Sequence, residues 1–385
     1  MLRKRYLDEI SNQFRVNPIC AILGPRQVGK TTLAKDFVNE NKINKAIFFD
    51  LEDPVDLARL DNPMLALCQL DVDLIIIDEI QLRPDLFSIL RVIVDKDITN
   101  KKFLILGSAS RDLLRQSSES LAGRIGYIEL PSFSLFEVGD SNKLIIRGGF
   151  PRSYLAENED DSFLWRKNYV TTFLERDIPM LGFNIPPMQM RRFWLMLTNY
   201  HGQTINFSEL ARSLMISDAI VKKYLDILAG TFMIRILSPW FENISKRQVK
   251  APKIYFRDIG ILNFLLGIKN KNNLVISHKL GAIWEGYALE EVVKYLKLNL
   301  EDVYFWSTQA EAELDLFVFK DGKKIGFEFK YLDAPKTTKS MHIVINDLKL
   351  DKLFVIYPGE INYHLTENIF VCGLESFVKN NFCNY

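Results

Sequence analysis

The strongest constraint on this chain is a phosphate-binding pattern at residues 24–31. They read Gly-Pro-Arg-Gln-Val-Gly-Lys-Thr and match G-x-x-x-x-G-K-[ST] in full. An apolar run at 19–23 predicts a buried strand before the pattern, and the spacing of residues 32–38 predicts a helix after it. The glycines let backbone N–H groups wrap a phosphate at a helix N-terminus. A strand, loop and helix of this kind predict an α/β domain.

The side chains of this loop are of the types that hold a nucleotide. Lys30 can reach the β- and γ-phosphates, and the Thr31 hydroxyl can ligate Mg²⁺. The alternative, a glycine-rich turn with a chance lysine, is disfavoured by the flanking strand and helix. The expected nucleotide contacts are Gly24, Pro25, Arg26, Gln27, Val28, Gly29, Lys30, Thr31 and Thr32.

A second motif complements the loop. Residues 74–79 read Leu-Ile-Ile-Ile-Asp-Glu, an apolar strand that ends in two adjacent carboxylates. Asp78 is expected to help hold Mg²⁺. Glu79 is expected to orient and deprotonate an attacking water, a role that needs a carboxylate near the γ-phosphate. A strand that merely ends at a charged turn is the alternative, and the order of the two motifs makes it the weaker one.

The first 140 residues or so alternate apolar runs with helical patterns, which predicts a parallel sheet covered by helices. Candidate strands lie at 19–23, 46–51, 74–78, 103–107 and 126–130. Ser108 follows the fourth of them and could touch the γ-phosphate or the attacking water, unless its hydroxyl caps the next helix. Arg124 precedes the fifth, where an arginine finger could stabilise transition-state charge; a surface arginine is the alternative.

Composition narrows the classes of protein that this chain fits. A length of 385 residues predicts about two to three domains. The net charge of +1 creates no global field for nucleic acid, so any such site must be a local patch. Four cysteines show no metal-ligand spacing, and no apolar run reaches the length of a membrane span. We therefore expect a cytoplasmic protein with reduced thiols, no structural zinc and no membrane partner.

The middle of the chain predicts two helical regions. Residues 151–203 are helical in pattern and rich in aromatics, which indicates a packed helical lid on the first domain. Within 204–262, a short helix capped by Ser208 and a second helix from Asp218 to about Leu228 match a helix-turn-helix, and two later strands make it winged. A packing or protein-binding module is the alternative. The expected basic face, suited to phosphate contacts, comprises Lys222, Lys223, Lys246, Arg247, Lys250 and Lys253.

A set of acidic residues characterises the last segment. Period-two geometry places Glu328 and Lys330 on one strand face, and Asp315 lies on the neighbouring strand among apolar residues. A buried carboxylate there needs a metal or another cation. With Glu285 on a nearby helix, the three acids are expected to hold Mg²⁺, and Lys330 to position the nucleophile of a phosphodiester cleavage. A structural ion pair, or a nuclease-like fold without activity, is the alternative.

Together these motifs resemble those of bacterial and archaeal AAA-type ATPases that carry a C-terminal domain similar to a restriction endonuclease. The resemblance rests on the ordered residues 24–31, 78–79, 107–108, 122–124 and 252–260, and on the Asp315 and Glu328-x-Lys330 layout of PD-(D/E)xK nucleases. It implies an α/β AAA-type P-loop ATPase domain at 1–150, a helical lid at 151–203, a winged helix at 204–262 and a nuclease-like α/β domain at 263–385. One departure is Phe329, where a small aliphatic residue is expected.

Two functions are compatible with this resemblance. In the first, ATP turnover positions the winged helix and licenses metal-dependent cleavage of nucleic acid. In the second, the chain is an ATP-controlled DNA-binding switch whose nuclease-like domain is inactive. The expected cofactors are ATP and Mg²⁺. The expected partners are DNA or RNA and, if Arg124 acts across a subunit boundary, further copies of the chain.

Overall fold

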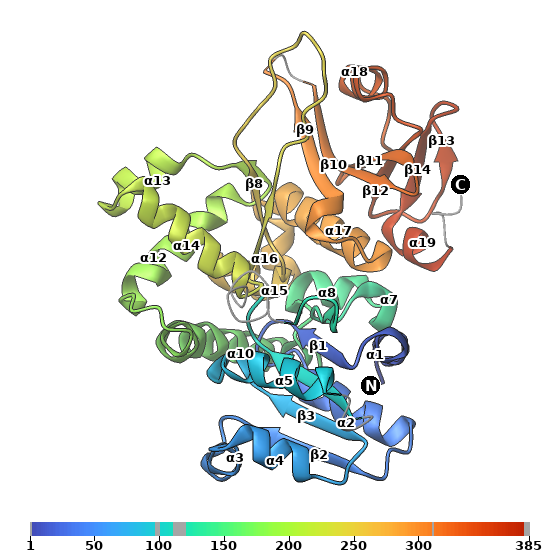
Figure 1. Cartoon of the computed structure of the whole chain (residues 1–385). Helices are drawn as coiled ribbons and strands as arrows, with labels where there is room; N and C mark the ends of the chain where they lie inside the picture. Colours follow the sequence, from blue (N-terminus) through green and yellow to red (C-terminus); the bar gives the residue numbers. More distant parts are fainter. Residues whose placement is uncertain (1, 97–100, 111–120, 310–311, 381–385) are drawn as a thin grey trace. The chain divides into compact units, whose positions relative to one another are not determined.

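The computed structural model describes residues 2–96, 101–110, 121–309 and 312–380 (Figure 1). The chain forms two compact units. The N-terminal unit comprises Met1–Ser132, Glu175–Asn184 and Gly230–Phe232, and the C-terminal unit comprises Phe133–Leu174, Ile185–Ala229 and Met233–Tyr385. The first unit thus ends its main segment at Ser132 rather than at 150, and the residues expected to form one helical lid are divided between the two units.

A parallel sheet forms the centre of the N-terminal unit. Its strand order is β2-β3-β4-β1-β5, and every neighbouring pair is parallel. The side chains of β1 and β3 are buried along their whole length, as a sheet covered on both faces requires. The strands are β1 (Ile19–Leu23), β2 (Ala46–Asp50), β3 (Leu74–Asp78), β4 (Lys102–Gly107) and β5 (Ile125–Glu129). The predicted parallel sheet is confirmed.

Helices cover both faces of this sheet. Cys20 and Ile22 of β1 share a hydrophobic core with the first two helices, whereas Ala21 belongs to the core on the opposite face, with α4 and α5. Alternate residues of one strand thus serve two cores. The helices are α1 (Lys4–Val16), α2 (Lys30–Glu40), α3 (Pro54–Arg59), α4 (Pro63–Gln69) and α5 (Leu86–Asp95), with the short 3-10 helix η1 (Ile80–Leu82).

The parallel register gathers predicted site residues at one edge of the sheet. Leu23 at the end of β1 pairs with Gly107 at the end of β4, so the phosphate loop and Ser108 begin at the same edge. Asp78 ends β3 at this edge as well. Ligands of open α/β sheets bind at such carboxyl ends. Arg124, in contrast, precedes β5 at the amino ends of the strands.

The first part of the C-terminal unit combines short helices with a three-stranded sheet of order β6-β8-β7. Its α13 is capped by Asn206, whose side chain accepts a hydrogen bond from the Glu209 N–H, and not by Ser208 as expected. The elements are α7 (Leu135–Val138), α8 (Ser141–Arg147), α9 (Pro151–Tyr154), α10 (Glu159–Thr172), η3 (Phe173–Asp177), α11 (Ile178–Met180), α12 (Pro187–Leu197), η4 (Thr198–Tyr200), β6 (Gln203–Thr204), α13 (Phe207–Leu214), α14 (Asp218–Gly230), β7 (Ile234–Leu237) and β8 (Lys253–Phe256). Of these, η3 straddles the boundary of the two units, and α11 belongs to the N-terminal unit.

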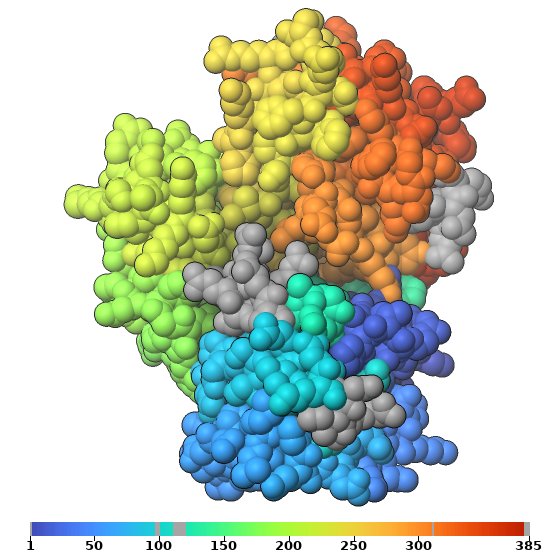
Figure 2. All heavy atoms as spheres, in the orientation of Figure 1, coloured from blue at the N-terminus to red at the C-terminus, as the bar shows by residue number. Residues whose placement is uncertain are grey.

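The long loop between β7 and β8 packs along β9 (Val303–Ser307). Its backbone donates from Trp240 N to Phe305 O at 2.7 Å, and from Val249 N to Ser307 O at 3.0 Å. Figure 2 shows this loop (yellow) at the surface beside the C-terminal sheet (orange). Lys246 of this loop forms an ion pair with Asp347, with 2.6 Å between Lys246 Nζ and Asp347 Oδ2. Part of the expected basic face is therefore neutralised.

A six-stranded mixed sheet completes the C-terminal unit. Its order is β13-β14-β12-β11-β10-β9, antiparallel between β9 and β11 and parallel from β11 to β14. Across the described residues, no helix has the length and apolarity needed to cross a membrane. The remaining elements are α15 (Ile259–Leu265), α16 (Lys271–Val275), α17 (Leu280–Leu296), η5 (Leu300–Asp302), β10 (Glu313–Lys320), β11 (Lys323–Phe329), α18 (Lys339–Leu348), β12 (Lys352–Tyr357), β13 (Tyr363–His364), β14 (Ile369–Gly373) and α19 (Leu374–Lys379).

Candidate active site

The phosphate loop needs glycine at both of its ends. A Cβ on Gly24 would lie 2.3 Å from the Leu130 carbonyl oxygen, so the strand end leaves no room for a side chain. Gly29 has φ +98°, a left-handed conformation that side chains rarely adopt. Gly29 also caps α2, which starts at Lys30. The two glycines therefore allow the chain to leave β1, turn, and present the N-terminus of α2.

Lys30 holds the loop in this shape. Its Nζ donates to the carbonyl oxygens of Gly24 and Pro25, each at 2.9 Å, and the residue is buried. Burial lowers the pKa of Lys30, and the carboxylates of Glu79 and Asp78 oppose this shift. An ammonium group bound only to neutral carbonyls can exchange these bonds for phosphate oxygens, which are stronger partners.

The residues expected to bind Mg²⁺ are in contact. Thr31 Oγ1 donates to Asp78 Oδ2 at 2.5 Å, which joins α2 to the end of β3. Asp78 is buried, and burial raises its pKa despite the bond from Thr31. A hydroxyl and a carboxylate next to a phosphate-binding loop are the oxygen donors that Mg²⁺ takes together with substrate phosphates. These two residues therefore fit a Mg²⁺ site.

Glu79 and Ser108 are also in contact, and both are hydrogen-bonded to Gln81, a residue that the sequence pattern did not single out. Ser108 Oγ donates to Glu79 Oε2 at 3.2 Å, and the Gln81 amide donates to the same carboxylate oxygen and to Ser108 Oγ at 3.0 Å. The Ser108 N–H in turn donates to Gln81 Oε1 at 3.2 Å. Gln81 thus fixes the relative position of β4 and the Glu79 carboxylate. The only signal for it was a polar residue between two apolar ones after the second motif.

Arg26 lies among three carboxylates of the N-terminal unit. Its guanidinium forms ion pairs with Glu52 and Asp177, and its Nη2 lies 3.7 Å from Glu79 Oε1. Arg176 pairs with Glu52 as well, at 3.0 Å. Burial alone would lower the pKa of Arg26, but the three acids outweigh it and raise the pKa above its ordinary value. Burial raises the pKa of Asp177, and Arg26 opposes that rise.

Arg124 is not among the residues gathered at the phosphate loop. It precedes β5 at the opposite edge of the sheet, where its guanidinium forms an ion pair with Asp95 at the end of α5. A third bond runs from Nη1 to the Ala122 carbonyl oxygen at 2.9 Å. Any action of Arg124 on a nucleotide therefore requires the site of another subunit.

The acidic set of the C-terminal unit is partly assembled. Asp315 and Glu328 lie on adjacent strands and are both buried. Lys330 Nζ lies 2.6 Å from Glu328 Oε2 and 4.0 Å from Asp315 Oδ2. The Phe329 N–H donates to Asp315 Oδ2 at 2.9 Å. Burial, followed by the charge of Asp315, raises the pKa of Glu328 to about 8.

Lys253 lies among these acidic residues. Its predicted position on an exposed basic face was therefore wrong. The side chain is buried on β8, and its Nζ lies 3.8 Å from both Glu285 Oε1 and Asp315 Oδ1 and pairs with Glu313. The Tyr255 hydroxyl donates to Glu285 Oε1 at 2.6 Å. Burial, followed by Asp315, raises the pKa of Glu285 to about 7. Because alternate residues of β8 share a face, Lys253 and Tyr255 both turn towards the acids and away from solvent.

The expected metal ligands Glu285, Asp315 and Glu328 therefore do not fit a divalent ion in this arrangement. Within the described part of the chain, no three His, Cys, Asp or Glu side chains are placed to hold one. The ammonium groups of Lys253 and Lys330 instead lie between the carboxylates. Two ammonium groups of the chain itself thus offset part of the negative charge of these carboxylates.

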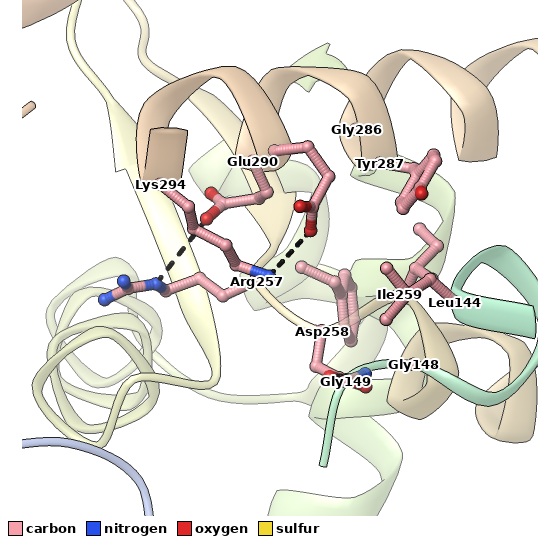
Figure 3. Close-up of a pocket in the computed structure, with 12 residues that line it drawn as sticks. Leu144, Gly148, Gly149, Arg257, Asp258, Ile259, Gly286, Tyr287, Glu290 and Lys294 are labelled. Atoms are coloured by element: carbon pink, nitrogen blue, oxygen red, sulfur yellow. Dashed lines mark hydrogen bonds and ion pairs between the residues drawn. The ribbon is translucent and has the colours of Figure 1, made fainter. Parts of the chain in front are cut away.

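A small pocket in the same unit is lined by paired charges (Figure 3). Glu290 receives two hydrogen bonds from Arg235, at 2.5 and 3.0 Å, and Glu291 pairs with Lys294 at 2.9 Å. Asp258 accepts the Gly149 N–H at 2.8 Å. The pocket holds about 10 Å³ of space, enough for about one water molecule. Apart from Arg235 in β7, these charged residues lie in the 252–260 motif and in α17. They hold the surrounding elements together, and the pocket between them has no room for a nucleotide.

Comparisons with known proteins agree with the loop chemistry. Residues 16–139 match the AAA domain, and residues 139–272 and 280–377 match two domains of unknown function, DUF8612 and DUF4143. The chain is 47% identical to the uncharacterized proteins Rv2008c of Mycobacterium tuberculosis and Mb2031c of Mycobacterium bovis, over 91% of its length and 79% of theirs.

Two solved structures show a more distant similarity to this chain. A Walker-type ATPase of Pyrococcus abyssi is 16% identical with a TM-score of 0.48, covering 69% of this chain and 95% of that one. A Drosophila ORC bound to GC-rich DNA and Cdc6 is 12% identical with a TM-score of 0.25, covering 69% and 90%.

Proposed function

This chain belongs to the family of the two mycobacterial proteins and carries an AAA domain at residues 16–139; on this premise we propose that its N-terminal unit binds ATP with Mg²⁺ and hydrolyses it. The observation that supports this most is the meeting of both motifs at one sheet edge. In support, Thr31 contacts Asp78 and Glu79 contacts Ser108 beside the phosphate loop, as a metal-ligand pair and a general base would require.

The residues divide the reaction among them. The Glu79 carboxylate accepts a proton from water as the water oxygen bonds to the γ-phosphorus. The bond from this phosphorus to the bridging oxygen breaks, and ADP leaves with the electron pair. Lys30 neutralises the β- and γ-phosphates. Mg²⁺, when bound between Thr31 and Asp78, supplies further neutralisation of the phosphate oxygens.

Replacing Lys30 by Ala tests the proposal directly. We expect the variant to lose nucleotide binding, because the cation on the phosphates is gone and two loop carbonyls lose their donor. Binding of a fluorescent ATP analogue to wild-type and variant protein measures this. Lys35→Ala is the control, since that lysine lies on the exposed face of the same helix, α2. Equal binding by the Lys30 variant and the wild type would refute the assignment of the loop.

A second candidate function is an ATP-controlled DNA-binding switch. Residues 204–262 place two helices before a small antiparallel sheet, which supports a winged helix. Four exposed cations of this region are Lys222, Lys223, Arg247 and Lys250. In residues 263–385, the acidic residues expected to bind a metal instead form ion pairs with lysines. This favours an inactive nuclease-like domain over a metal-dependent nuclease. Duplex DNA is the expected ligand, and these cations are expected to bind it through phosphates rather than through bases.

Replacing these four residues by Glu is expected to weaken duplex binding similarly for all sequences. If each cation neutralises one phosphate, every phosphate left without its cation makes the negative slope of log affinity against log salt less steep by about one. Fluorescence anisotropy over a salt series measures both quantities. Lys246→Glu is a useful comparison, because its partner Asp347 already neutralises it. Unchanged affinity in the fourfold variant would assign these helices to protein packing.

We also propose that Arg124 acts across a subunit boundary of a homo-oligomer. Mixing Arg124→Ala protein with Lys30→Ala protein should then restore part of the phosphate release, because each chain supplies what the other lacks. Analytical ultracentrifugation shows whether the mixed oligomer forms. Full turnover by Arg124→Ala in a monomeric protein would rule this role out.

A further inference from the structure

We propose that Arg26 is an arginine finger supplied in cis, and that it stabilises the charge of the γ-phosphoryl group during transfer. The proposal rests on the ATP hydrolysis proposed above and adds a catalytic residue to it. Arg26 is the third residue of the phosphate loop, so its backbone is fixed by the same turn that receives the phosphates.

The position of the guanidinium supports this role. Its Nη2 lies 3.7 Å from Glu79 Oε1. A general base must lie within reach of the water that attacks the γ-phosphorus, so a cation next to Glu79 lies at the γ-phosphate end of the site. Burial leaves 13% of the Arg26 side chain exposed, and a guanidinium shielded from water acts more strongly on a nearby anion. The loop itself thus places a permanent positive charge beside the reacting group.

The charges around Arg26 explain how it can change partners. Glu52, Glu79 and Asp177 surround it, while Arg176 is the second cation of the group. Three acids and two arginines leave a net charge of −1, so one acid is in excess, and the entry of a triphosphate makes the excess larger. A guanidinium has five N–H donors in a fixed fork, so it can give up a bond to Glu52 or Asp177 and donate to a phosphate oxygen. In the transition state, negative charge spreads over the γ-phosphate oxygens, and this bond is strongest there.

The sheet topology separates Arg26 from the other candidate. Arg124 lies at the amino ends of the strands and pairs with Asp95, whereas Arg26 lies at the carboxyl ends with Thr31, Asp78 and Glu79. Within one N-terminal unit, Arg26 therefore lies at the sheet edge where that unit's own nucleotide is expected, whereas Arg124 does not.

The test compares the ground state with a transition-state mimic. Full-length Arg26→Ala protein with Mg²⁺ is expected to bind ADP with nearly wild-type affinity. Its affinity for ADP with aluminium fluoride, which imitates the transferred phosphoryl group, is expected to fall about 10³-fold, the lower end of what arginine fingers contribute to kcat. Calorimetry measures both affinities without depending on turnover. Arg26→Lys should recover part of the loss, because it keeps the charge and loses the fork.

Two further variants separate catalysis from simple charge effects. Arg176→Ala removes the neighbouring, more exposed arginine and should leave both affinities unchanged. Asp177→Asn removes a competing carboxylate and should leave the affinity for the mimic equal or higher. Wild-type affinity of Arg26→Ala for the mimic overturns the proposal, and so does an equal loss for ADP and for the mimic. If wild-type protein binds neither, the proposed ATP hydrolysis itself fails.

Discussion

Glu79→Gln is expected to keep ATP binding and to lower its turnover by about 10²–10⁴-fold, the usual contribution of a general base. The amide keeps the shape of the carboxylate, and its oxygen can still accept the bonds from Gln81 and Ser108. It cannot take a proton from water at neutral pH. A single-turnover experiment with labelled ATP should show bound, uncleaved nucleotide after the protein is separated from free ligand.

The matched control for this variant is Glu52→Gln, the same chemical change at another carboxylate that contacts Arg26. This variant should keep turnover. Glu52 is not the last residue of a β-strand, and among the described residues its side-chain bonds go to Arg26 and Arg176 and not to Ser108 or Gln81. Wild-type cleavage by Glu79→Gln would show that another group is the base. Equal losses in both variants would mean that charge around Arg26, and not proton transfer, limits the reaction.

Lys253→Met is expected to destabilise the C-terminal unit by about 3–5 kcal/mol at pH 7, the cost of removing one partner from a buried ion pair. Met keeps the apolar stem but leaves Glu285, Glu313 and Asp315 without this ammonium. Urea unfolding followed by tryptophan fluorescence measures the change, since Trp284 and Trp306 lie buried in this unit. Lys246→Met is the control: its pair with Asp347 is more exposed, so a loss below about 1 kcal/mol is expected.

The pH dependence of this penalty follows from Glu285. Burial and Asp315 raise its pKa in the folded state to about 7, from an ordinary 4.5. A raised pKa means that the folded state holds the proton more tightly, so the contribution of Glu285 to stability is full below pH 4.5 and is lost as the pH rises through about 7. Without Lys253, ionisation of Glu285 is harder still. The difference between variant and wild type should therefore shrink from pH 8 to pH 5. A penalty that is constant over this range would mean that the ionisation of Glu285 does not contribute to it.

Local patterns were sufficient to predict the sheet edge at which the two motifs meet. The strands at 19–23 and 74–78 have the predicted bounds, because continuous apolar runs between turn residues have few alternative structures. Asp78 and Glu79 follow such a run, so their place at the sheet edge follows from where the strand ends. The direction of the chain at each strand end then brings Ser108 to Glu79.

Pairs that form across long sequence separations could not be predicted in this way. Asp177 meets Arg26 across 151 residues, and no periodicity connects the two positions. Lys253 was expected on a basic face because its neighbours in sequence include Lys250 and Arg247. Its actual environment depends on β10 and α17, which begin about 30 to 60 residues later and supply the three acids. Burial of a lysine is decided by such tertiary partners and not by local composition.

The return of Glu175–Asn184 to the N-terminal unit affects how this molecule can be dissected. Neither unit is a single stretch of sequence, since the chain changes unit after residues 132, 174, 184, 229 and 232. A fragment that stops at Ser132 keeps both nucleotide motifs but lacks Asp177, one of the three acids that form ion pairs with Arg26. Truncation at the most obvious place thus yields a fragment with an altered phosphate-loop site, and nucleotide-binding measurements on such a fragment would not describe the full chain.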